Sequence, residues 1–422
     1  MTLLISNIRN LIHVEENPRL IYKGQDMSVI QTFENAYLLI TGSTIHSYGE
    51  STMEALKKIR HDHPGIIEID ATGRYVFPSW CDSHTHLVYA GSRENEFVGR
   101  IKGLTYEEIA KNGGGILNSS KKIHQASEDE LYESSISRMN EILHLGTGAV
   151  EIKSGYGLDT ENELKILRVI KRIRDTSNLT VKATFLGAHA IPENYKGNKK
   201  GYLDLLINEM LPAISAENLA DYCDIFCEKN YFDKSDAIRL FEAAYKHGLQ
   251  PKVHAEQLSH SGGIEAGVEC NAISVDHLEY ADDNDINLLN NSSTMPVILP
   301  GAQFFLGLKK PPVREMISKG LPVAISSDYN PGSCPSGNMN QMISLACILY
   351  NMTPEEAILA STTNSAYAMN LSESVGSISP GKKANVFITK EIPSYSYLPY
   401  SFGSNLVDKV ILNGELMKED SF

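Results

Sequence analysis

The chain has 422 residues, of which 42% are hydrophobic and 21% charged, a composition typical of a globular protein with a sizeable core. Its 38 Lys and Arg against 52 Asp and Glu give a formal charge of −14, which argues against a nucleic-acid partner because phosphate binding needs a basic surface. No apolar run approaches the roughly 20 residues that span a bilayer, and no secretory leader is evident at the start. We therefore expect a cytoplasmic protein without a membrane partner.

Short apolar runs separated by turns fill residues 1–75, and similar runs return near the other end, over 384–388 and 407–414. This pattern predicts short strands. We expect residues 1–75 and 373–422 to share one small β-sandwich domain formed by both chain ends. The segment 76–372 is then inserted between its two parts.

The segment 76–372 alternates strand-like apolar runs with amphipathic helical stretches, the pattern of β/α units around a parallel sheet. Eight such runs predict a (β/α)8 TIM-like barrel. The runs lie at about 76–82, 147–152, 180–187, 222–227, 250–255, 272–276, 294–299 and 321–327. Helical patterns fill most gaps, and the one over 354–369 begins with a Thr353 cap. Two long insertions, at about 90–120 and 188–201, follow the first and third strands and are expected at the C-terminal face, where barrels build active sites.

The first of these runs leads into His84 and His86, a His-x-His pair. Residues two apart on a strand share a face, so both imidazoles can bind one metal ion. An isolated His-x-His is more often a pair of solvated or core histidines, and the chain carries a second one, His61 and His63, which we expect at a polar helix end on the surface. The apolar run before His84 and further candidate ligands at later strand ends distinguish the first pair.

Chemically capable polar side chains recur at or just past the predicted strand ends. Beyond the first histidine pair they are Lys153, His189, Glu228, His254, His277 and Asp328. Each alone has an ordinary explanation, but together they converge on one mouth of the barrel and predict a metal-dependent site. Imidazoles with a carboxylate suit Zn²⁺ or Fe²⁺, and a site with an open position lowers the pKa of a bound water to about 7. The predicted reaction class is hydrolysis.

Longer motifs surround these residues. They are Phe77 to His86 with Gly91-Ser92-Arg93, Glu151 to Leu158, Phe185 to His189, His254 to Leu258, and Ser327 to Ser333. His-x-His alone is a weak signal, whereas Lys-Ser-Gly-Tyr-Gly-Leu combined with Asp-x-Asn-x-Gly-Ser is specific. In these motifs, and over most of its length, the chain resembles the imidazolonepropionase family of the amidohydrolase superfamily. That family converts 4-imidazolone-5-propanoate and water into N-formimidoyl-L-glutamate in histidine degradation.

The resemblance implies a role for each matching residue. The implied metal ligands are His84, His86, His254 and Asp328. The implied substrate contacts are Arg93, Tyr156, His189, Gln257, Asn330, Gly332 and Ser333. His277 resembles the superfamily histidine that lies beside the metal site without being a principal ligand. Ring opening needs a polarised carbonyl and a proton shuttle, which makes His277, Asp328 and Gln257 the catalytic candidates, with the choice of shuttle left open between His277 and Asp328.

The family resembles the mononuclear branch of the superfamily, which implies one Zn²⁺ or Fe²⁺ per chain, a small anionic substrate and a homodimer. A second metal bridged near Glu228 or Lys153 is the alternative. Another cyclic amidohydrolase or deaminase is the nearest alternative function, and a non-catalytic binding module is a more distant one. Arg93 favours a carboxylate-bearing ring, although it has an alternative as a surface partner of Glu94 or Glu96.

Overall fold

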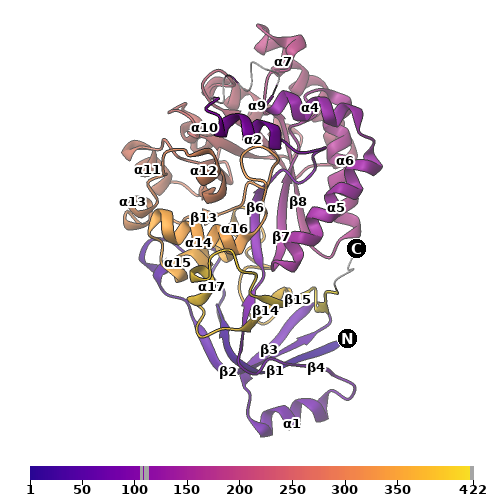
Figure 1. The fold of residues 1–422 in the computed structure, drawn as a ribbon, viewed down its shortest axis with the longest axis vertical. Helices are drawn as coiled ribbons and strands as arrows, with labels where there is room; N and C mark the ends of the chain where they lie inside the picture. Colours follow the sequence, from indigo (N-terminus) through magenta and orange to yellow (C-terminus); the bar gives the residue numbers. More distant parts are fainter. Residues whose placement is uncertain (105–107, 109–113, 419–422) are drawn as a thin grey trace.

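The computed structural model describes residues 1–104, 108 and 114–418, and it has two parts, one above the other in Figure 1. The upper part is a barrel in which strands β6 to β13 follow one another in chain order, all parallel. The strands are β6 (Trp80–Thr85), β7 (Thr147–Lys153), β8 (Thr180–Ala188), β9 (Tyr222–Cys227), β10 (Gln250–Ala255), β11 (Ser274–His277), β12 (Met295–Ile298) and β13 (Ala324–Ile325).

The barrel closes through the residues that follow its first and last strands. The backbone N–H of Asp328 donates to the carbonyl of His84 at 3.0 Å, and that of His86 donates to the carbonyl of Tyr329 at 2.9 Å. The closing contacts therefore involve three predicted metal ligands. The predicted (β/α)8 barrel is confirmed.

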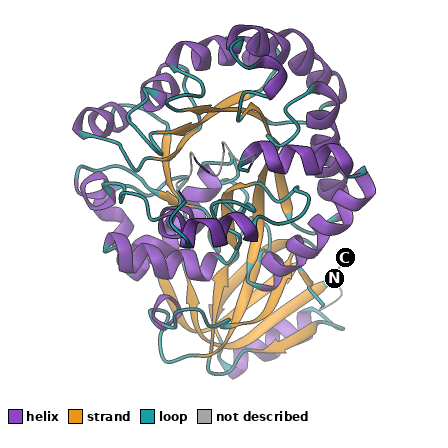
Figure 2. Cartoon of the chain, turned by 45° about the horizontal axis from the view of Figure 1, so that its top comes forward, coloured by secondary structure: helices purple, strands orange, loops and turns teal. Residues whose placement is uncertain are grey.

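Helices surround the ring of strands, as Figure 2 shows. They are α2 (Glu94–Ile101), α4 (Ile116–Gln125), α5 (Glu128–His144), α6 (Thr160–Thr176), α7 (Lys199–Leu205), α8 (Leu211–Glu217), α9 (Lys234–Lys246), α10 (Gly263–Glu269), α11 (Asp283–Asn290), α12 (Pro300–Leu306), α13 (Val313–Ser318), α14 (Met339–Tyr350), α15 (Pro354–Leu359) and α16 (Ser365–Tyr367). The short helical segments are the 3-10 helix η2 (Glu193–Tyr195) and the π helices η3 (Leu206–Met210) and η4 (Ala360–Asn364). Of the predicted insertion at 90–120, residues 105–107 and 109–113 lie outside the described residues.

Local sequence explains where these helices begin and which face they bury. Helix α6 is capped by Asp159, whose side chain accepts from the N–H of Asn162 at 2.8 Å, and its buried Ile166, Ile170 and Ile173 recur at helical spacing. Thr353 caps α15 as predicted, within a capping box. The predicted helix over 354–369 is α15, η4 and α16 in succession.

The lower part is a mixed eight-stranded sheet built from both chain ends. Its strands are β1 (Thr2–Ile12), β2 (Thr32–Thr41), β3 (Thr44–Glu50), β4 (Ile67–Asp70), β5 (Arg74–Pro78), β14 (Val386–Glu391), β15 (Val407–Leu412) and β16 (Glu415–Leu416). The first residues of β1 pair with β4 and its last residues with β5, so one strand joins the parts of the sheet. The short helices here are η1 (Gly24–Ser28), α1 (Met53–Asp62) and α17 (Tyr397–Tyr400).

The strand predicted over 76–82 is in fact two strands in different sheets. Strand β5 ends at Pro78 and pairs with β14 in the lower sheet, while β6 begins at Trp80 in the barrel. The N–H of Ser79 still donates to the carbonyl of Asn385 beside β14, whereas that of Trp80 donates to the carbonyl of Gly146 beside β7, so the pairing changes between these two residues. The Trp80 and Phe387 rings lie 4.9 Å apart, which packs the start of β6 against the lower sheet. The apolar run is continuous because both strands are buried.

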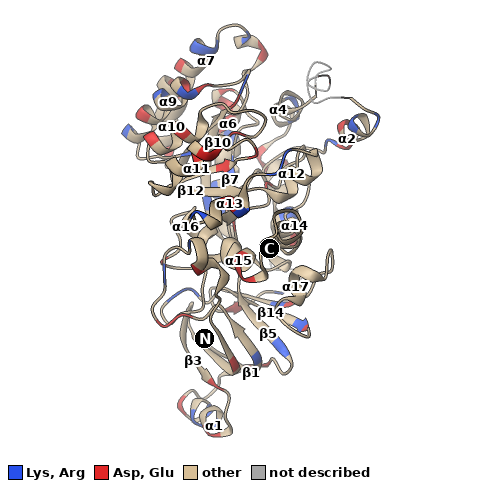
Figure 3. Ribbon diagram, turned by 90° about the vertical axis from the view of Figure 1, so that its left-hand side faces the viewer, with Lys and Arg blue, Asp and Glu red and all other residues tan. Residues whose placement is uncertain are grey.

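Charged residues of both signs mix on the outer helices, for example along α7 and α9 in Figure 3. Such mixing is expected of a solvated surface and fits the acidic overall composition. Within the described parts of the chain, no helix combines the length and the apolar character needed to cross a membrane.

His13 lies at the joint between the two parts, just after β1. It is buried, and its ring nitrogens lie 3.4 Å from the hydroxyl oxygens of Thr362 and Thr363 in η4. Burial lowers the pKa of His13 to about 4, because the charged imidazolium loses its hydration there, although Glu15 opposes this effect. A neutral imidazole is therefore buried where the lower sheet contacts the barrel.

We expect the free energy of unfolding to fall as the pH drops from 6.5 towards 4. Above this window His13 is neutral in both states, whereas within it only the unfolded chain takes up the proton, so protonation favours unfolding. The difference between the two pKa values corresponds to about 3 kcal/mol. Denaturant unfolding at several pH values should give a shallower pH dependence for His13→Gln than for the wild type. Equal slopes would show that His13 does not contribute.

Candidate active site

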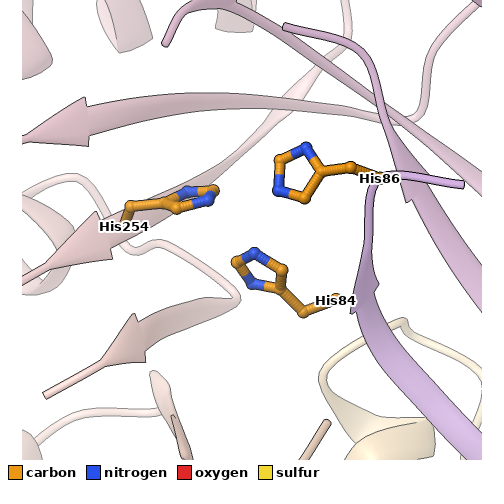
Figure 4. A group of neighbouring side chains, drawn as sticks. All are labelled: His84, His86 and His254. Atoms are coloured by element: carbon orange, nitrogen blue, oxygen red, sulfur yellow. The ribbon is translucent and has the colours of Figure 1, made fainter. Parts of the chain in front are cut away.

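Three imidazoles meet at the C-terminal end of the barrel. His84 lies in β6, His86 follows that strand, and His254 lies in β10. One nitrogen from each ring lies within 4.8 Å of the other two, and Figure 4 shows the rings converging. Asp328, which follows β13, joins them, with its Oδ1 at 3.6 Å from Nε2 of His84 and 3.6 Å from Nε2 of His86. We call these four predicted ligands the metal-ligand cluster.

The surroundings of the metal-ligand cluster fit a bound cation. Nε2 of His84 is buried without a hydrogen-bond partner among the described residues, which is unfavourable unless a ligand takes it. Nδ1 of His84 contacts Asp276 at 2.6 Å, and Nδ1 of His254 lies 3.0 Å from Asp224. Carboxylates in these positions fix the ring orientation that presents Nε2 to a metal. Burial also holds the pKa of both His84 and His86 well below its usual value, which favours the neutral imidazole that metals bind.

Lys153 lies under the metal-ligand cluster. Its Nζ donates to Glu151 at 2.6 Å and to Asp224 at 2.8 Å, and lies 3.7 Å from Asp276. Lys252 pairs with the other oxygen of Glu151, and all five side chains are fully buried. A network of opposite charges avoids the large cost of an unpaired buried ion. Lys153 thus supports the two carboxylates that orient the histidines.

The Glu228 carboxylate binds the backbone of the loop that follows β10. Its carboxylate accepts from the N–H groups of Leu258 at 2.8 Å and Ser259 at 3.2 Å. It therefore fastens the segment after β10 that carries Gln257.

A cavity of about 340 Å³ opens above the metal-ligand cluster. Its lining includes every substrate contact predicted from the sequence, namely Arg93, Tyr156, His189, Gln257, Asn330, Gly332 and Ser333. It also includes His86, His254, His277 and Asp328. The sequence pattern does not identify Arg100 or the apolar wall, which consists of Leu104, Ile116, Phe226, Leu258, Leu306 and Leu308. The recurrence of polar residues at strand ends cannot mark these positions, because most lie in helices or loops away from those ends.

The loop after β7 that carries Tyr156 is held by a buried carboxylate. Glu163 in α6 accepts from the N–H of Gly155 at 3.1 Å and from that of Gly157 at 2.6 Å. A Cβ on Gly157 would lie 2.3 Å from the backbone nitrogen of Glu163, so glycine is required for this approach. The carbonyl of Gly155 in turn lies 3.0 Å from Nδ1 of His189. The specific motif around Tyr156 thus shapes the cavity wall.

The loop after β13 has a similar internal structure. Oδ1 of Asn330 accepts from the N–H groups of Gly332 and Ser333, both at 2.8 Å. The hydroxyl of Ser333 donates to Asp328 at 3.0 Å. A Cβ on Gly332 would lie 2.1 Å from Nη1 of Arg93, so this glycine makes room for the guanidinium. The second specific motif therefore positions both Asp328, a predicted metal ligand, and the neighbouring guanidinium of Arg93.

Arg93 pairs with Glu96, one of the two partners in the alternative interpretation, but Arg93 lines the cavity instead of lying on the outer surface. The Arg93 Nη2 to Glu96 Oε2 distance is 2.8 Å, and the arginine side chain is only 8% exposed. Glu94 instead accepts from the hydroxyl of Ser92. The guanidinium thus lies between Glu96 and the loop of Gly332, at the side of the cavity.

His277 ends β11 beside the metal-ligand cluster. Its ring centroid lies 5.6 Å from that of His84 and 5.3 Å from that of His254. Burial lowers the pKa of His277, but Glu279 and Asp328 raise it, and the net direction is upward. This position allows His277 to exchange a proton with a molecule in the cavity.

The model of the amidohydrolase family matches residues 75–417. The imidazolonepropionase of Christiangramia forsetii is 55% identical over 417 residues, covering 99% of this chain and 100% of the relative. That of Flavobacterium johnsoniae is 52% identical over 417 residues, with 99% and 100% covered.

Solved structures share the fold at low identity. Guanine deaminase of Escherichia coli superposes with a TM-score of 0.71 at 14% identity, covering 99% of each chain. Atrazine chlorohydrolase of Arthrobacter aurescens, complexed with zinc, has a TM-score of 0.72 at 14% identity, covering 99% of this chain and 96% of that one. These two show the fold alone, whereas the sequence relatives are close over full length. The chain belongs to the imidazolonepropionase family of the amidohydrolases.

Proposed function

We propose that this chain hydrolyses 4-imidazolone-5-propanoate to N-formimidoyl-L-glutamate, a step of histidine degradation. The observation that carries the proposal is the placement of Arg93 in the wall of the cavity that opens onto the metal-ligand cluster. The substrate is a small ring amide with a carboxylate tail. The cluster suits the amide and the guanidinium suits the tail.

The cavity also fits this substrate in size and charge. Its volume of about 340 Å³ is at the small end of the range for small-molecule sites, which begins at roughly 300 Å³. The protein carries a formal charge of −14, so an anionic ligand needs a local cation. Arg93 and Arg100 supply two cations in the lining, and Phe226 with the leucines supplies an apolar wall for the ring.

The reaction adds one water to the ring carbonyl and breaks its bond to the ring nitrogen. The carbonyl carbon becomes a carboxyl group, and the nitrogen takes up a proton. A bound Zn²⁺ or Fe²⁺ would polarise the carbonyl and lower the pKa of water at the site. His84, His86, His254 and Asp328 would hold that ion. His277 borders the cavity beside them and moves a proton from water to the leaving nitrogen, or shares this task with Asp328.

Several finer parts of the proposal rest on the resemblance. We propose one ion per chain, because Lys153 is committed to carboxylates and Glu228 to a loop. Zinc is the ion in the Arthrobacter aurescens structure, and the imidazole-rich donor set here suits Zn²⁺ or Fe²⁺. Gln257 is proposed to assist at the carbonyl. A homodimer and a cytoplasmic location remain predictions, which size-exclusion chromatography with light scattering and cell fractionation would test.

The test is purification with metal analysis, followed by turnover. Imidazolone propanoate, generated enzymatically, should lose its ultraviolet absorbance only when protein and metal are both present, with N-formimidoyl-L-glutamate identified by mass spectrometry. Hydantoin, dihydroorotate and guanine serve as the comparison substrates. Turnover of one of these but not of the imidazolone would contradict the proposal and favour another cyclic amidohydrolase or deaminase.

Replacing Arg93 with Met should raise KM for the imidazolone by roughly 10- to 150-fold. A charged hydrogen bond contributes about 1.5 to 3 kcal/mol, and the apolar side chain removes it. kcat falls as well if the anchored tail aligns the ring. Arg93→Lys should restore only part of the lost substrate binding, because an ammonium lacks the paired donors of a guanidinium. Steady-state kinetics measure both parameters.

Arg168→Met is the matched control. Arg168 also pairs with a glutamate, Glu217, at 2.7 Å, but on the exposed outer surface. It should leave both kinetic parameters unchanged. An unchanged kcat/KM in Arg93→Met would remove Arg93 from substrate binding.

A further inference from the structure

Behind His277 lies a buried carboxylate, Glu279, to which the reaction as described gives no role. The two side chains are 2% and 1% exposed, and Nδ1 of His277 lies 3.8 Å from Oε1 of Glu279. Among the described residues, neither that nitrogen nor either oxygen of Glu279 has a hydrogen-bond partner. Buried polar groups without a hydrogen-bond partner are costly. Nδ1 of His277 and the carboxylate of Glu279 are neighbours, and each can supply the partner that the other lacks.

The backbone is bent to bring Glu279 to this position. His277 and Leu278 have φ angles of +91° and +72°, a left-handed conformation that neither side chain favours. These two residues bend the chain directly after β11, and the carboxylate of Glu279 lies beside the ring of His277. The segment after β10 holds this bend, because the N–H of Leu278 donates to the carbonyl of Ala255 at 3.1 Å, and that of Tyr280 donates to the carbonyl of Glu256 at 2.8 Å. Strain of this kind is often found at functional sites.

The other edge of the imidazole belongs to the active site. His277 lines the cavity, and its ring lies against those of His84 and His254. When Nδ1 is turned towards Glu279, Nε2 is the nitrogen that remains for the cavity. A partner on one imidazole nitrogen determines the tautomer and so the chemistry of the other.

We propose that Glu279 is a positioning residue that accepts a hydrogen bond from Nδ1–H of His277 and so holds Nε2 ready as the proton-transfer atom. The inference rests on the proposed function. In the reaction, Nε2 takes one proton from water and gives it to the leaving ring nitrogen. His277 and Glu279 therefore end each turnover in the protonation state in which they began.

The first test compares Glu279→Leu with Glu279→Gln. Leucine removes the acceptor, so kcat should fall roughly 10- to 100-fold, a typical effect of losing an outer partner of an active-site imidazole. Glutamine keeps an acceptor oxygen and should lose less. KM and metal content should stay unchanged in both. Loss of metal, or a raised KM with unchanged kcat, would overturn the proposal.

A double-mutant cycle separates positioning from general packing. In a His277→Ala background, Glu279→Leu should reduce kcat by less than about twofold, since the group through which it acts is gone. The same fold loss in both backgrounds would overturn the proposal.

A spectroscopic test needs no substrate. In zinc-loaded protein labelled with ¹⁵N-histidine, the His277 signals, assigned by their loss in His277→Ala, should show a protonated Nδ1 that Glu279→Leu redistributes between the nitrogens. An unchanged tautomer would overturn the inference even with normal turnover. Failure of the wild type to hydrolyse the imidazolone would instead overturn the proposed function, and the spectra would still decide the pairing.

Glu356→Gln is the control for stability. This buried carboxylate caps α15 and pairs with Arg314 at 2.6 Å, far along the chain from the site. It should lower Tm but leave kcat and the His277 signals unchanged. If Glu279→Leu does not fold, Glu279→Gln carries both the kinetic and the spectroscopic test.

Discussion

Replacing His254 with Ala should remove the bound metal and nearly all turnover. Its Nδ1 is oriented by Asp224 at 3.0 Å, which leaves Nε2 for the ion. Losing an outer partner of a metal ligand costs roughly 10- to 100-fold in affinity, so losing a ligand itself should cost more. Elemental analysis after dialysis should find far less than one ion per chain, with turnover falling in proportion.

The chain supplies its own control for this experiment. His61 and His63 repeat the His-x-His spacing, but they lie at the end of α1, where His61 is 88% exposed. Replacing either with Ala should change neither metal content nor turnover. Full occupancy and activity in His254→Ala would place the metal site elsewhere.

The barrel could be predicted because its signal is periodic. Each buried parallel strand is an apolar run of several residues, and helices with one apolar face separate the runs. In a barrel of parallel strands, the C-terminal strand ends, such as those near His84 and His254, all lie at the same end of the barrel. The residues at and after these strand ends could therefore be grouped without knowing any distance.

The supporting residues could not be grouped in this way. Asp224 and Asp276 lie inside β9 and β11, and which histidine each one orients depends on the register of neighbouring strands. For Asp224 the available signal was a single carboxylate within an otherwise apolar strand, which is costly unless it is paired. Glu279 carries even less signal, because its position depends on two left-handed residues that no sequence pattern marks.

The break at Pro78 was missed for a related reason. Hydrophobic periodicity reports burial, and β5 and β6 are both buried on either side of Ser79. The N–H of Ser79 donates to the carbonyl of Asn385 at 2.9 Å, a pairing between positions more than 300 residues apart.

Replacing His277 with Ala should lower kcat by roughly 10²- to 10⁴-fold while the metal stays bound. That range is the usual contribution of a positioned acid or base, and His277 borders the cavity beside the metal-ligand cluster without belonging to it. KM should change little, because Arg93, which we propose holds the tail, lies on another loop. Pre-steady-state kinetics and elemental analysis on the same preparation separate the two effects.

His260→Ala is the control for the loss of an imidazole near carboxylates. His260 lies 3.1 Å from Asp285 but is 46% exposed, outside the cavity lining. It should leave kcat unchanged. If His277→Ala instead loses metal in step with its rate, His277 is a ligand, since a proton shuttle can be removed without opening the coordination sphere. A second ion near Lys153 would then have to be reconsidered, and two ions per chain in the wild type would establish it.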